Sequence, residues 1–205
     1  MSIGARIDEC MNKLSIGDAE NAFIQLAIAI DGTAKRLHPG KKTTDRCKVF
    51  LRDNLPFVFW SLTNGTPSRC NDLLSRFGGS GHPNQNTRFE DLVYGIIRCA
   101  LLHEGEMPEK VEFVSGPYIG MLRGRMQFPI ALIGSLLLAV IASPVNARER
   151  VSASTFFTFG KTRVYVSEFI GSLERTKDSV RLGFLYDVEK LLLDADAPDS
   201  QAPAS

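Results

Sequence analysis

The sequence predicts a mainly α-helical fold with a small β-hairpin appendage, and three segments carry this prediction. Apolar residues recur at the helical period from Phe89 to Leu101. A continuous apolar segment, Ile130–Ala142, has the length of a buried helix. Two short apolar runs within Phe156–Val166 flank a Gly160-Lys161 turn, which is typical of a β-hairpin. The first two segments indicate that helices supply the core.

Size and composition predict one globular domain. A chain of 205 residues, with 44% apolar and 23% charged residues, is close to the average globular protein and long enough for one core. We expect a single domain over residues 1–194, with the hairpin at about 151–166, and a disordered tail rich in Ala, Pro and Ser over residues 195–205. The net charge of +1 gives no overall attraction to nucleic acid or membrane.

The first predicted helix begins after Asp18, which can cap its N-terminus, and runs from Ala19 to about Ala34. Apolar residues occupy almost every side of this segment, so the helix should be buried nearly all round. Asp31 then stands out as an acid in an apolar neighbourhood. The sequence His38-Pro39-Gly40 is a stop signal, after which a new element should begin.

A short helix should begin at Thr43 or Thr44 and end before Pro56, because proline disrupts a helix interior. The apolar segment Phe57–Leu62 is compatible with either helix or strand. Further along the chain we expect a turn at Asn64–Pro67, a helix from Ser68 to about Phe77 and a flexible loop over Gly78–Asn86.

The helix that contains the Phe89–Leu101 pattern has clear start and stop signals. Thr87 and Glu90 form a capping box at its start, and Gly105 followed by Pro108 ends it. Strand-like pieces follow at Glu112–Val114 and Met126–Phe128, and a last helical region at about Ser172–Leu193.

The apolar segment between Pro129 and Pro144 is too short for a membrane helix, which needs roughly 20 residues. We therefore interpret Ile130–Ala142 as a core helix and expect no membrane partner; a re-entrant membrane segment is the alternative. The N-terminal segment is interrupted by charges such as Arg6 and Asp8 and does not resemble a signal peptide.

Cysteine and histidine usage predicts no metal or other cofactor. The cysteines form no close pair of the CxxC type, which fits a reducing cytoplasm. The histidines are isolated and none lies in a zinc-binding frame such as HExxH. The residues concerned are Cys10, Cys47, Cys70 and Cys99, and His38, His82 and His103.

The charge is uneven along the chain, with a basic middle and an acidic end. Between residues 115 and 165 the sequence contains several arginines and lysines but only one acid, Glu149, whereas acids outnumber bases beyond Val166. This middle could bind an anionic ligand, pair with the acidic end or carry ordinary solvated charge. The candidate anion-binding residues are Arg123, Arg125, Arg148 and Arg150.

Arg98 and His103 are the candidate catalytic pair. An imidazole can move a proton near neutral pH, and a guanidinium can hold a phosphate with two hydrogen bonds. These groups together suffice for RNA cleavage without a metal. Spacing alone is weak support, because Arg76 and His82 have a similar separation across a glycine-rich loop.

The helical wheel separates these two side chains. Arg98 lies almost opposite the apolar stripe, on a mixed face with Tyr94 and Leu102, and His103 lies at the stripe's edge. The mixed face indicates that this side of the helix packs on another surface, such as a second copy of the chain. Because Arg98 and His103 point about 140° apart on one helix, a composite site would need one residue from each copy.

The segment L-V-Y-G-I-I-R-C-A-L-L-H-E-G, Leu92–Gly105, resembles the final helix of HEPN domains. These are small helical bundles, and many are metal-independent RNases with an arginine, four to six residues and a histidine. The wider layout is similar to uncharacterised bacterial and phage relatives that share an Ile30-Asp31 pair and a later P-V-N sequence, here Pro144–Asn146.

The resemblance implies a helical bundle of HEPN type that acts as a homodimer on RNA, as a toxin or antiphage effector with an antitoxin partner in some cases. It assigns catalysis to Arg98 and His103 and supporting roles to Tyr94, Glu104 and Asp31. Catalytic members often carry a polar residue after the arginine, where this chain has Cys99. That departure favours two alternatives: a non-catalytic HEPN-like module that binds RNA, nucleotide or protein, and a helical interaction protein.

Overall fold

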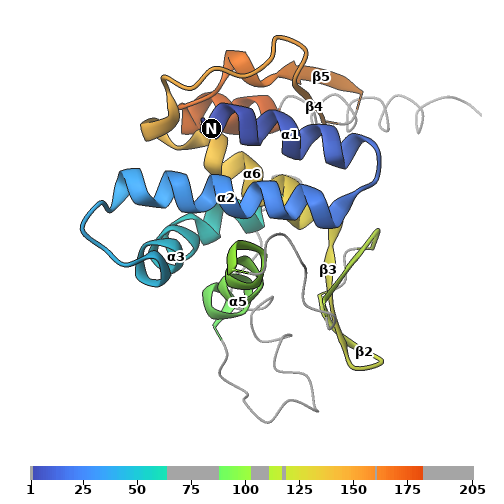
Figure 1. The fold of residues 1–205 in the computed structure, drawn as a ribbon. Coiled ribbons are helices and arrows are strands. Elements are labelled where there is room, and N and C mark those ends of the chain that lie inside the picture. The colour runs from blue at the N-terminus through green and yellow to red at the C-terminus, as the bar shows by residue number, and fades with distance from the viewer. Residues whose placement is uncertain (1, 64–87, 103–110, 117–118, 160, 182–205) are drawn as a thin grey trace, which may run out of the picture.

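Helices form most of the fold, and two small β-sheets lie at its periphery (Figure 1). This computed structural model describes residues 2–63, 88–102, 111–116, 119–159 and 161–181. The apolar helix α6 (Ile130–Ala142) lies at the centre, where it contacts α2 (Ala19–Leu37) and α3 (Thr43–Leu62). The predicted fold class, mainly α with a small β appendage, is confirmed.

The N-terminal helix α1 (Ile3–Ser15) was not foreseen, and it packs along α2. The hydroxyl of Ser2 accepts a hydrogen bond from the backbone N–H of Ala5 and caps this helix. A Cβ atom at Gly4 would lie 2.0 Å from the carbonyl oxygen of Arg150, so only glycine allows this close approach. The predicted cap of α2 is confirmed, because the Asp18 carboxylate accepts from the N–H of Asn21.

Helix α3 runs through Pro56, so the predicted end before this proline is wrong. Proline removes one backbone N–H, which leaves the carbonyl of Arg52, four residues earlier, without its helical partner. Both residues are exposed, so water can satisfy that carbonyl. Phe57 and Phe59 lie beyond the proline in the core, and their burial favours a continued helix. The undecided segment Phe57–Leu62 is therefore helical.

Helix α5 (Phe89–Leu102) confirms the strongest periodic pattern of the sequence and contacts both α2 and α3. Glu90 of the expected capping box is buried, whereas Thr87 lies outside the described residues. The expected turn and helix at 64–77, the loop at 78–86 and the helix end at Gly105 also lie outside them.

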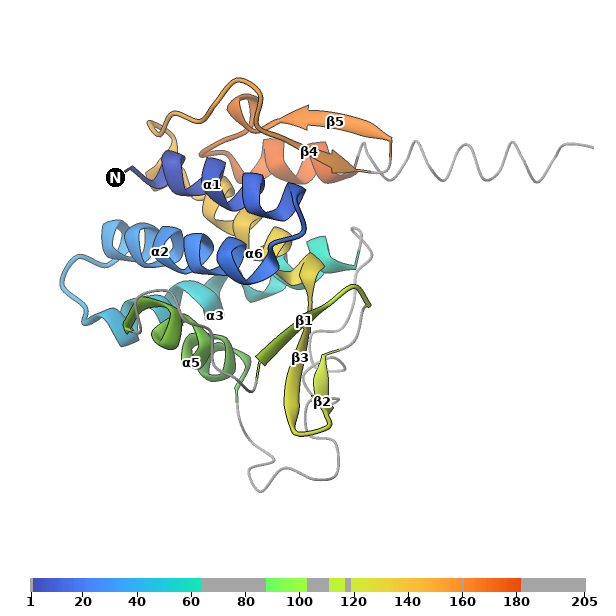
Figure 2. The same cartoon turned by 45° about the vertical axis from the view of Figure 1, so that its right-hand side comes forward.

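The first sheet contains strands β1 (Val111–Val114), β2 (Gly120–Leu122) and β3 (Arg125–Pro129) in the order β1-β3-β2. The two predicted strand-like pieces become β1 and β3, which pair in parallel, whereas β2 was not predicted. The β2–β3 turn has positive φ at Arg123 (50°) and Gly124 (77°). The central helix α6 begins directly after β3, and the sheet lies at the lower right of the helices in Figure 2.

The second sheet is the predicted hairpin, formed by β4 (Phe156–Phe159) and the antiparallel β5 (Thr162–Tyr165). Short 3-10 helices, η1 (Pro144–Asn146) and η2 (Val166–Glu168), flank it along the chain, and residues 173–181 are helical. The remainder of the last predicted helix and the tail lie outside the described residues. Among the described helices, none is long and apolar enough to cross a membrane.

Candidate functional site

Arg98 is exposed near the C-terminal end of α5, as the helical wheel predicted. Within the described part of the chain its guanidinium has no hydrogen bond or ion pair, in contrast to Arg36 and Arg46, which both bind carboxylates. An unpaired exposed guanidinium can bind a phosphate without first breaking an internal contact. His103 and Glu104, the next two predicted site residues, lie outside the described residues.

Tyr94, one turn before Arg98, contacts α3 of the same chain. Its hydroxyl hydrogen-bonds to the hydroxyl of Thr44 at 2.8 Å, and the Lys48 ammonium lies 5.6 Å from the centre of its ring. Lys48 also pairs with Asp91 at 2.7 Å. The mixed face of α5 was expected to pack on a further surface, such as a second copy. For Tyr94 that surface is α3, so Tyr94 holds the helix that carries Arg98.

Asp31 joins α2 to α3. Its Oδ1 accepts hydrogen bonds from Nε and Nη2 of Arg46, at 2.9 and 2.6 Å, and from Sγ of Cys47 at 3.6 Å. The side chain of Arg46 is 13% exposed and that of Asp31 is 27% exposed, so the pair is largely withdrawn from water. Asp31 is thus the carboxylate that neutralises Arg46, and it can support Arg98 only indirectly, through the packing of the helices.

The buried cysteines offer no nucleophile. Burial raises the pKa of Cys10 to about 12. Burial also raises the pKa of Cys47 to about 12, and the neighbouring Asp31 carboxylate adds to the shift. A thiol with such a pKa is almost fully protonated at neutral pH and does not react as a thiolate.

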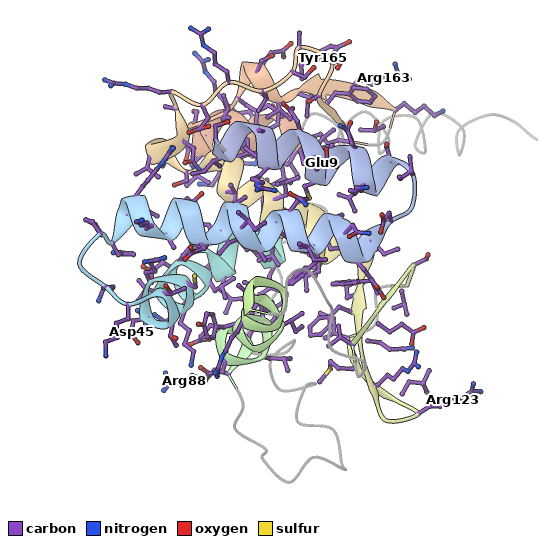
Figure 3. All side chains as sticks on the ribbon, viewed as in Figure 1. Glu9, Asp45, Arg88, Arg123, Arg163 and Tyr165 are labelled. Carbon is purple, nitrogen blue, oxygen red and sulfur yellow. The ribbon has the colours of Figure 1, made fainter. Side chains whose placement is uncertain are left out.

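The four arginines predicted to bind anions do not form one surface. All are exposed, but Arg123 and Arg125 flank the β2–β3 turn, whereas Arg148 and Arg150 follow η1 beside the first turn of α1. Figure 3 labels Arg123 on that turn and Arg163 on the hairpin at the opposite side of the molecule. The basic middle of the sequence is therefore divided in space.

The last residue of the P-V-N sequence, Asn146, forms hydrogen bonds to several elements of the bundle. Asn146 is fully buried, and its Nδ2 donates to Oγ1 of Thr33 at 2.9 Å and to the carbonyl oxygen of Val140 at 2.8 Å. Its Oδ1 accepts from Nη1 of Arg36 at 3.3 Å, and Arg36 also pairs with Glu149 at 2.5 Å. This network links α2, α6 and η1, so the P-V-N motif has a structural role in holding these elements together.

Glu149 extends the network to α1, since its Oε2 accepts from the backbone N–H of Gly4 at 2.7 Å. Burial by itself raises the pKa of the Glu149 carboxyl. The hydrogen bonds from Gly4 and from Arg36 outweigh that effect and hold the pKa below its ordinary value. The carboxylate form therefore stabilises the folded chain.

Comparison with known families gives a match that extends over nearly the whole chain. The Rv1289 family model matches residues 2–195. The chain belongs to the Rv1289 family. No curated protein and no solved structure matches it. The Rv1289 match includes α1, α5 and the hairpin, so these parts belong to one family unit.

This Rv1289-family chain also has a cavity of about 580 Å³ between α1, the start of α6 and β4, which no motif of the sequence indicated. Such a volume is in the range of small-molecule sites. Its wall combines apolar side chains with hydroxyls and one carboxylate, and includes Met11, Ala131, Phe156, Thr158 and Asp8. None of the predicted site residues lines it, and the described residues contain no cluster of potential metal ligands.

Proposed function

We propose that this Rv1289-family protein is a metal-independent endoribonuclease of HEPN type that acts as a homodimer. The observation that carries the proposal is Arg98, which is exposed and unpaired among the described residues near the end of α5, five residues before His103. A helical bundle with a cation at this place matches what the HEPN resemblance implies. Tyr94 supports the arrangement because its bond to Thr44 fixes α5 against α3.

The proposed chemistry needs a proton acceptor, a proton donor and a phosphate-binding cation. The ribose 2′-hydroxyl attacks the neighbouring phosphorus, the bond from phosphorus to the 5′-oxygen breaks, and a 2′,3′-cyclic phosphate forms. Arg98 binds the phosphate oxygens and stabilises their increasing negative charge. His103 takes the proton from the 2′-hydroxyl or gives one to the leaving 5′-oxygen. In each composite site a single His103 serves both steps, since it can take up the proton of the 2′-hydroxyl and then pass it to the leaving 5′-oxygen.

The alternative is a HEPN-like module that binds RNA without cleaving it. Two observations favour it. Asp31 is occupied by Arg46, and is therefore not free to orient an imidazole. Cys99 follows Arg98 where catalytic members often have a polar residue. A binding module would still use the unpaired Arg98, but its RNA would remain intact.

Incubation of the purified protein with total RNA and excess EDTA separates these functions. Wild type should cleave, and Arg98→Ala and His103→Ala should each reduce the rate by about 10²-fold or more. Arg88→Ala is the matched control for arginine, because Arg88 is exposed at the other end of α5 (Figure 3), and His38→Ala is the control for histidine. Intact RNA with salt-sensitive binding would reject the nuclease and leave the binding module.

A further inference from the structure

The contacts between α3 and α5 fix the relative direction of these helices. Lys48 pairs with Asp91, and Thr44 hydrogen-bonds to Tyr94. Residue numbers thus fall along α3 as they rise along α5, so the helices are antiparallel in this region. The C-terminal end of α5 lies beside the start of α3, as Figure 2 also shows.

This register places Arg98 close to two lysines. Arg98 is four residues beyond Tyr94, which is about 6 Å along the axis and only about 40° around it. Thr44 is the second residue of α3, and Lys41 and Lys42 immediately precede the helix. The side chains of Lys41, Lys42 and Arg98 are exposed. None of the three has an ion pair within the described part of the chain.

The acids around this end of the bundle do not cancel that charge. Asp31 is neutralised by Arg46, and Asp91 by Lys48. Asp45, which Figure 3 labels in the first turn of α3, is the one exposed carboxylate without an ion pair among the described residues of that turn. Among the described residues at this end of the bundle, these three unpaired cations outnumber the unpaired acid Asp45, so their summed charge is positive although the chain as a whole is nearly neutral.

We infer that Lys41, Lys42 and Arg98 form one surface that binds successive phosphates of a single RNA strand. The inference rests on the proposed function for the identity of the ligand, and adds the two lysines to the substrate contacts. The cations are exposed on two elements, so an isolated phosphate would compete poorly with water. A strand can contact all of them and release a counterion at each contact, which makes its affinity strong and dependent on salt.

Fluorescence anisotropy with a labelled single-stranded RNA, 2′-O-methylated so that it cannot be cleaved, tests the surface apart from catalysis. We compare wild type with Lys41→Gln/Lys42→Gln at several KCl concentrations. Loss of two phosphate contacts should reduce the slope of log Kd against log salt by about 1.4. If wild type and the lysine variant have the same Kd near 1 M salt, the Kd of the variant at 0.1 M should be about 25-fold higher than that of wild type. Arg98→Gln should reduce the slope by about 0.7.

The matched control is Lys161→Gln/Arg163→Gln, which removes the same charge from the hairpin on the far side of the bundle (Figures 1 and 3). An unchanged slope in the lysine variant, or an equal loss in the control, would overturn the inference. Displacement of the RNA by poly-glutamate at equal charge would also overturn it and indicate an acidic protein ligand.

Cleavage of unmodified RNA in EDTA distinguishes failure of this surface from failure of the proposed function. Tight binding through the lysines with no cleavage would reject the nuclease and keep the surface. Cleavage with an unchanged KM in the lysine variant would reject the surface and keep the nuclease. Circular dichroism spectra of all variants should match wild type, because every substituted side chain is exposed.

Discussion

Removal of the Asp31 carboxylate should destabilise the fold without removing a catalytic group. In Asp31→Ala, Arg46 loses both of its hydrogen bonds to Oδ1, and its largely buried guanidinium keeps its charge without a partner. Removing one partner of a fully buried pair costs about 3–5 kcal/mol. Because the Asp31 side chain is 27% exposed, water can reach the space that it leaves, and we expect the unfolding free energy to fall by about 2–3 kcal/mol.

Urea unfolding monitored by circular dichroism measures this loss. With a slope of about 2 kcal/mol per M urea, the midpoint should fall by about 1 M. Asp45→Ala is the matched control, since Asp45 is an exposed acid without an ion pair to the described residues, and it should change the unfolding free energy by less than about 0.5 kcal/mol. The double variant Asp31→Ala/Arg46→Met should recover most of the stability because it removes the unpaired charge.

Two results would refute this reasoning. One is a loss below about 0.5 kcal/mol in Asp31→Ala, and the other is a double variant as unstable as the single one. RNA cleavage or binding by Asp31→Ala should follow its folded fraction. Loss of activity in fully folded Asp31→Ala would instead assign Asp31 to the site.

Further predictions concern the buried network and the thiols. Asn146→Ala should lower the unfolding free energy, measured in urea, by about 2–4 kcal/mol. The double variant Thr33→Val/Asn146→Ala should lose less unfolding free energy than the sum of the two single variants, because they share one hydrogen bond. Strict additivity would contradict that shared hydrogen bond. Since the pKa of Glu149 is lowered in the fold, its contribution is full above the ordinary value near 4.5 and is lost as pH falls below it. The difference in urea midpoint between wild type and Glu149→Gln should therefore shrink from pH 7 to pH 3, and a constant difference would reject this role. With pKa values of about 12, Cys10 and Cys47 should resist iodoacetamide at pH 8 until urea unfolds the chain, as measured by peptide mass spectrometry, and rapid labelling of the native protein would show that they are not buried.

Local patterns predicted the central parts of the fold. The periodic apolar residues of α5, the uniform apolar run of α6 and the Gly160-Lys161 separation of the hairpin each reflect one element and its own burial. Helix α1 was missed although its buried residues Ile3, Ile7 and Cys10 follow the helical period and Ser2 caps it. That signal was present in the sequence.

Other features depend on contacts that no local pattern contains. The length of α3 depends on the burial of residues after Pro56, which outweighs the local preference of proline. The parallel pairing of β1 with β3 joins segments that are separated along the chain. The exposure of Arg98 followed from the helical wheel, whereas the contact of Tyr94 with Thr44 required the packing of α3 on α5.

The most direct test of the proposed shared site mixes two inactive variants. If Arg98 of one copy acts with His103 of the other, a mixed dimer of Arg98→Ala and His103→Ala contains one intact site and one that lacks both groups. Random exchange makes about half of the dimers mixed, so EDTA-resistant cleavage should return to about a quarter of the wild-type rate. No recovery after demonstrated subunit exchange would contradict a site shared between two copies.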